Sequence, residues 1–348
     1  SIQAEALNAL ALSRFLVGRE AEAAEQFEAA IAAARAAGNL QLVAGYSMNL
    51  ANIRNNLGQH AQAMELAEEA VGIHRRFEHE SDLARALLVW SSSARRAKRH
   101  EVAHTAAVEA RELAERLGDQ RRFAAALRSL AANHEAQKHS EIAVSLLEQL
   151  EALYGEMGAA GARDEVQERL AFHYLNFGRL EEARDLLTSL ELNLRDSPMD
   201  GSPRDLLLVQ VHLTFAKLEI RSERPDHALE RLLDLQLRLL HVQRHQPRMR
   251  ALGIVHSLEG GDLKTRAFYG SLERLAAEHS DPRIRLEAKL DQVRLLRLAG
   301  EIERARQEAV SLQGRAREAE LSWIVDHAEL EIEALDEEKD QAPPSETR

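Results

Sequence analysis

The chain has 348 residues, of which 45 % are hydrophobic, 29 % charged and 4 % aromatic. This composition, dominated by helix-forming side chains, excludes a disordered chain. The formal net charge of −12 argues against nucleic-acid binding, and the absence of cysteine excludes disulfides and thiolate chemistry. No stretch is apolar enough to span a bilayer and no signal peptide is visible, so we expect a cytoplasmic protein without a membrane partner.

Small residues recur along the first half of the chain with a period of 40 residues. An alanine stands at Ala23, Ala63, Ala103, Ala143 and Ala183, and a second small residue precedes each by twelve positions, at Ala11, Ala51, Ser91, Ala131 and Ala171. Glycines are separated by multiples of twenty residues, as at Gly18, Gly38 and Gly58. The pattern predicts two helices of about 16–18 residues per unit, joined by turns that carry Gly or Lys, with small residues where helices touch. One such hairpin cannot bury its apolar faces alone, so the hairpins must stack.

This order of residues resembles the tetratricopeptide repeat. A large and a small residue follow each other in the first helix, and a turn glycine, such as Gly18, precedes the alanine by five positions. The resemblance is to the long, 40-residue kind found in the maltose-regulon activator and related bacterial signalling regulators. It covers about residues 1–320 and implies an all-α fold, a right-handed α-solenoid of about eight helix-turn-helix (TPR-like) repeats plus a C-terminal capping helix.

The spacing also predicts the domain organisation. We expect TPR-like repeats 1–5 over residues 1–197, a loop or soft joint over 198–203, divergent TPR-like repeats 6–8 over 204–320, a capping helix over 321–337 and a disordered acidic tail over 338–348. The seventh repeat, near residues 245–280, has a short first helix in this interpretation.

One string invites an enzymatic interpretation. His100-Glu101-Val102-Ala103-His104 matches the H-E-x-x-H pattern, in which two histidines one helical turn apart ligate zinc and the glutamate acts as general base. However, Ala103 is the repeat's own small residue, and no third ligand stands out. We therefore expect no catalytic residue, no metal and no cofactor, and keep a zinc hydrolase as a distant alternative.

Polar residues on the first helices suggest a binding groove on the concave face of the stack. The candidates are Asn52, Asn55, Asn56, Arg85, Ser92, Arg95, Arg96 and Arg128. Asparagine amides can pair with the backbone of an extended peptide, and arginines can bind a carboxylate with two parallel hydrogen bonds. The same residues would look similar on a merely solvated helix face.

We expect a non-enzymatic protein–protein interaction module that binds a protein or extended peptide, including partners with acidic groups. The resemblance implies the docking or sensing region of a larger bacterial regulatory protein. The alternative is a receptor for a small signalling peptide or metabolite.

Overall fold

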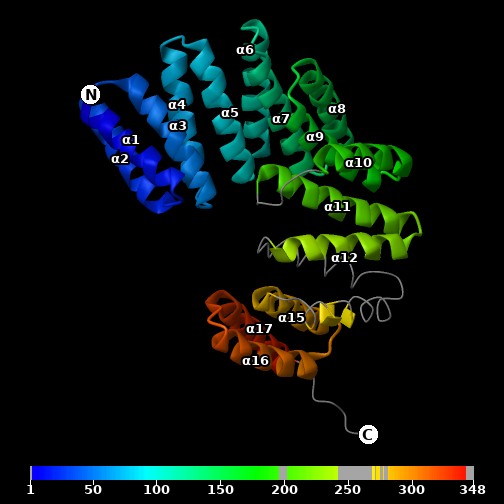
Figure 1. Cartoon of the computed structure of the whole chain (residues 1–348). Coiled ribbons are helices and arrows are strands. Elements are labelled where there is room, and N and C mark those ends of the chain that lie inside the picture. Colours follow the sequence, from blue (N-terminus) through cyan, green and yellow to red (C-terminus); the bar gives the residue numbers. More distant parts are fainter. Residues whose placement is uncertain are drawn as a thin grey trace. The chain divides into compact units, whose positions relative to one another are not determined.

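The computed structural model describes residues 2–195, 202–241 and 281–341, together with 269, 270, 272–274 and 277. All regular structure in these residues is α-helical, which confirms the expected fold class (Figure 1). The helices are α1 (Ile2–Leu16), α2 (Glu20–Ala36), α3 (Leu40–Asn56), α4 (His60–Arg76), α5 (Glu80–Arg96), α6 (His100–Arg116), α7 (Gln120–Ala136), α8 (Ser140–Glu156), α9 (Ala160–Asn176), α10 (Leu180–Leu194), α11 (Pro203–Arg221), α12 (Pro225–His241), α15 (Pro282–Leu298), α16 (Ile302–Glu318) and α17 (Ser322–Gln341). Two compact units, Ser1–Val166 and Gln167–Arg348, divide the chain within α9.

The helices from α2 to α9 have a constant length and a constant spacing along the sequence. Each has 17 residues, within the predicted length. Three residues separate each of these helices from the next. Both helices of a repeat therefore have the same length, and the connector inside a repeat is as long as the connector between repeats.

The connector between α2 and α3 shows how each helix ends. Gly38 has a φ of 70°. Its N–H donates to the carbonyl of Arg35 at 2.9 Å, and the N–H of Asn39 donates to the carbonyl of Ala34 at 3.0 Å. These two bonds define a Schellman ending. The carbonyl of Asn39 then accepts from the N–H of Val43, so one residue closes α2 and opens α3.

The same ending recurs along the described chain. The left-handed position is glycine at Gly18, Gly58, Gly118, Gly158, Gly178 and Gly300, and another residue at Glu78, Lys98, Lys138, Glu223 and Glu320. The turns carry the predicted Gly or Lys at most of these positions, but Glu78, Glu223 and Glu320 differ from the prediction. A left-handed conformation costs a residue with a Cβ atom about 1–2 kcal/mol, so the second set is held by the surrounding helices.

The predicted small residues lie where helices touch. All ten are buried, with exposed fractions of 0 % or, at Ser91, 1 %. The Ser91 hydroxyl donates to the carbonyl of Ala103 at 2.8 Å, which shows how closely α5 approaches α6. A larger side chain at Ala103 would push the two helices apart.

The joint predicted over 198–203 ends earlier than expected. α11 begins at Pro203, with Ser202 as its N-cap in a capping box with Asp205. The cap satisfies backbone groups that a loop would leave to water, so the helix starts before the predicted boundary at 204. Residues 198–201, and most of the seventh repeat predicted near 245–280, lie outside the described residues.

The C-terminal helix is longer than expected. Ile324, Ala328 and Leu335 of α17 are fully buried in one cluster with residues of α15 and α16. α17 runs to Gln341, so residues 338–341 are helical rather than part of a disordered tail. Residues 342–348 lie outside the described residues.

Residues of α17 past its predicted end form ion pairs with neighbouring helices. The guanidinium of Arg297 contacts the carboxylate of Glu338 at 2.6 Å, and the ammonium of Lys339 contacts Glu303 at 2.6 Å. These pairs connect the last turns of α17 to α15 and α16.

Among the described helices, none combines the length and apolar character that crossing a membrane requires.

Two alanine substitutions of glycine should have opposite effects. Gly118 has a φ of 65°, so Gly118→Ala should destabilise the protein by about 1 kcal/mol. Gly72 lies inside α4 with no atom within 4 Å of an added Cβ, so Gly72→Ala should stabilise it by about 0.5–1 kcal/mol. Urea unfolding of both variants measures the difference, and two shifts of the same sign would contradict the connector geometry.

Candidate functional site

The first helices of the second, third and fourth repeats pack directly on each other. α3 contacts α5, and α5 contacts α7. No comparable contact joins α2 to α4, α4 to α6 or α6 to α8, helices whose residues the structure describes in full. Helices on the inner side of a curved stack lie closer together than those on its outer side. Within the unit Ser1–Val166, α3, α5 and α7 therefore form an inner row and α2, α4, α6 and α8 an outer row.

The inner row carries most of the predicted contact residues on its accessible side. Asn52, Asn56, Arg85, Arg96 and Arg128 are exposed, and Ser92 and Arg95 are half-exposed. Asn52 of α3 and Ser92 of α5 stand 40 residues apart, at equivalent positions of two helices that pack together. The accessible residues thus continue from one helix to the next across the repeats.

Asn55 is the exception, because it is buried between helices. It is 5 % exposed, and its amide donates to the Ser93 hydroxyl of α5 at 2.8 Å. Ser93 in turn donates to the carbonyl of Val89 at 2.9 Å. The neighbouring helix covers this side of α3 and also buries Met48. Asn55 therefore joins two repeats and cannot contact a ligand.

The accessible candidates Asn56 and Arg85 have partners within the chain. The Asn56 amide donates to the carboxylate of Glu20 at 3.0 Å. Arg85 lies 3.5 Å from the Asp82 carboxylate, and its side chain is 54 % exposed. An exposed pair of this length contributes at most about 1 kcal/mol, so the Arg85 guanidinium can exchange Asp82 for an incoming carboxylate.

The H-E-x-x-H string contributes to packing between repeats. Nδ1 of His100 lies 3.0 Å from the Asn133 amide oxygen on α7. The His104 ring packs edge-on against His134, also on α7, with 5.4 Å between ring centroids. The pKa of His134 is lowered mainly by burial, and the nearby His104 and His139 lower it further. In the described part of the chain, three potential metal ligands lie close together at His74, His79 and Asp82. Neither His100 nor His104 belongs to this group.

Sequence reasoning missed the spaces between outer helices. A pocket of about 460 Å³ lies between α2 and α4, over Leu50 and Arg54 of α3. A second, of about 350 Å³, lies between α10 and α12, over Leu208 and His212 of α11. In both, two second helices form the walls and the first helix between them forms the floor. The period alone could not reveal these pockets, because their existence depends on how far the outer helices separate.

The repeated connectors and stacked hairpins define the class of protein. The chain is a TPR-like helical repeat protein with an α-solenoid fold. No protein-family model and no curated protein matches its sequence significantly.

Several solved structures share this fold. The apo form of RapI matches with a TM-score of 0.52 and 10 % identity, over 90 % of this chain and 99 % of that one. The apo form of the quorum sensor NprR from B. thuringiensis matches with a TM-score of 0.50 and 10 % identity, over 95 % and 98 %. A signal-transduction ATPase with a tetratricopeptide repeat sensor, from Pyrococcus horikoshii, matches with a TM-score of 0.56 and 12 % identity. That match covers 93 % of this chain but only 50 % of that protein. At these identities the similarity shows the fold alone.

Asn52 and Asn55 should respond differently to alanine. Asn55→Ala should lower the free energy of unfolding by about 1–2 kcal/mol, because it removes a buried hydrogen bond and leaves a gap between α3 and α5. Asn52→Ala should change it by less than about 0.5 kcal/mol, because the side chain is exposed. Urea unfolding distinguishes the two, and an equal loss in both variants would mean that Asn52 also has a structural role.

Proposed function

We propose that the chain is a non-enzymatic interaction module that binds an extended segment of a protein or peptide across the inner row. In this proposal it is the docking or sensing region of a larger cytoplasmic bacterial regulator, as its resemblance to the 40-residue repeat type suggests. The observation that carries the proposal is the accessible set of amides and arginines on α3, α5 and α7, helices that pack side by side.

The spacing of the inner row suits an extended ligand. Packed helices lie about 8–10 Å apart, and an extended chain advances about 3.3 Å per residue. A peptide that crosses the row meets a new helix about every three residues. Three helices therefore contact a segment of about seven to nine residues.

The charge of the inner row favours an acidic ligand. Arg85, Arg96 and Arg128 are exposed there, although the chain as a whole carries a formal charge of −12. Guanidinium groups bind carboxylates through paired hydrogen bonds, and the exposed Asn52 amide offers a donor and an acceptor to a peptide backbone.

The second candidate function is a receptor for a small signalling peptide or metabolite. The outer pockets favour it, because about 460 Å³ and about 350 Å³ lie in the range that small molecules occupy. Each pocket lies between two outer helices, so a ligand bound there would change the distance between these helices. The similarity in fold to NprR, which is described as a quorum sensor, agrees with such a role.

A charge reversal on the inner row tests the first candidate. We expect the full chain to bind nine-residue peptides from an acidic library, measured by fluorescence anisotropy. Arg85→Glu with Arg96→Glu should weaken binding at least about tenfold, without changing the thermal midpoint, because both side chains are exposed.

The control is Arg76→Glu, an exposed arginine at the end of the outer helix α4. It should bind the peptides as the unchanged chain does. Equal losses in both variants would indicate nonspecific attraction, and the absence of peptide binding would contradict the inner-row proposal.

A further inference from the structure

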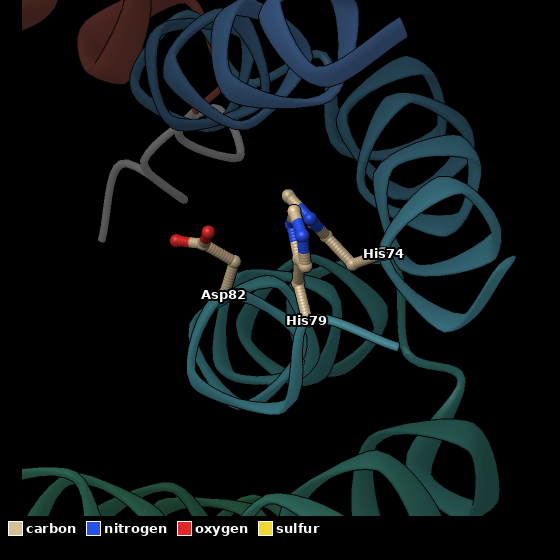
Figure 2. Close-up of side chains that lie close together, drawn as sticks. All are labelled: His74, His79 and Asp82. Atoms are coloured by element: carbon tan, nitrogen blue, oxygen red, sulfur yellow. The ribbon is translucent and has the colours of Figure 1, made fainter. Parts of the chain in front are cut away.

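The connector between α4 and α5 brings two histidines together. His74 lies near the end of α4, and the N–H of His79 donates to its carbonyl at 3.2 Å in the Schellman ending. This bond places the two side chains, five residues apart in sequence, next to each other. Figure 2 shows their rings side by side, with Asp82 from the first turn of α5 beside them.

The three side chains converge closely enough to share an ion. One ring nitrogen of His74, one of His79 and one carboxylate oxygen of Asp82 all lie within 4.8 Å of one another. Donors around a tetrahedral ion, with bonds of about 2.1 Å, stand about 3.4 Å apart. His79 is exposed and the Asp82 side chain is 45 % exposed, so both can rotate to close the difference.

The buried histidine supplies an independent reason to expect a ligand. His74 is only 3 % exposed, and neither of its ring nitrogens has a hydrogen-bond partner. Buried polar groups almost always have one. Burial lowers the pKa of His74, which favours the neutral imidazole that binds metals.

We propose that His74, His79 and Asp82 bind a divalent transition-metal ion, with zinc as the best fit. Two imidazoles and one carboxylate are a common zinc ligand set, and water would complete the tetrahedron. The ion would join the end of α4 to the start of α5. Arg85, 3.5 Å from Asp82, is the nearest competing cation, and its exposed side chain can turn towards solvent.

A second histidine pair, five residues apart in another connector, provides the comparison. His134 and His139 have the same places relative to the helix ending in the connector between α7 and α8, which lies inside a repeat, with Nδ1 atoms 3.5 Å apart. Ile142 stands where the first site has Asp82, and it is 49 % exposed. The second pair therefore lacks the carboxylate, and His104 packs against it instead.

Zinc titration of the full chain, without a histidine tag and after removal of metals with EDTA, tests the assignment. Calorimetry should show about one equivalent of Zn²⁺ bound with a micromolar or lower Kd, and the thermal midpoint should rise. His79→Ala and Asp82→Asn should each weaken binding at least about tenfold. His139→Ala, in the connector between α7 and α8, should bind as the unchanged chain does.

Substitution of His79, Asp82 and His139 keeps the buried His74 intact, and equal thermal midpoints in EDTA verify that each variant folds. No saturable binding up to about 100 μM Zn²⁺ would overturn the assignment. Loss of binding in His139→Ala but not in His79→Ala would overturn it as well, because it would place the ion at the second pair.

Discussion

The three-residue connector is the constraint on which the described architecture depends. In most connectors of the described chain, one residue ends a helix in the left-handed conformation and the next residue opens the following helix. α11 is an exception, because it begins at Pro203 with Ser202 as its cap. The connectors between α1 and α10 share one length and one pair of hydrogen bonds, so successive helices turn by a repeated amount. The small residues can then meet at every hairpin, and residues such as Lys98 accept an unfavourable backbone conformation to keep that geometry.

The inner and outer rows also differ in the residues that they leave accessible. Inner helices such as α3 are covered by neighbours on both sides, so only a narrow stripe of each remains accessible. Ion pairs in a repeating register, Arg35 with Glu69 and Arg75 with Glu109, link outer helices, and a pocket opens between α2 and α4. The connector itself creates a third environment, in which side chains five residues apart touch. His74 and His79 are one example, and the stacking of Arg179 on Tyr174, with 3.8 Å to the ring centroid, is another.

Much of the fold could be predicted from the sequence, because backbone contacts demand small residues and most described helix endings place a residue at positive φ, where glycine is favoured. The site was less predictable. Helical periodicity identifies a stripe of residues, but it does not show whether solvent or another helix lies opposite. Asn55 looked like a groove residue, and only its contact with Ser93, 38 residues away, shows that it is internal. The convergence of His74, His79 and Asp82 was equally hidden, because their spacing has no helical meaning until the connector's shape is known.

The equal length of all helices between α2 and α9 has a consequence for how such a chain can change in evolution. Loss or duplication of a forty-residue block keeps every remaining helix on its own side of the stack. Loss of a twenty-residue block would preserve each turn but exchange the two sides for everything that follows, so that water-facing surfaces would be forced against neighbours. Length variation among descendants of this gene should therefore come in pairs of helices. Insertions or losses of an odd number of helices should be confined to the ends of the stack, where a single helix can cap the last repeat.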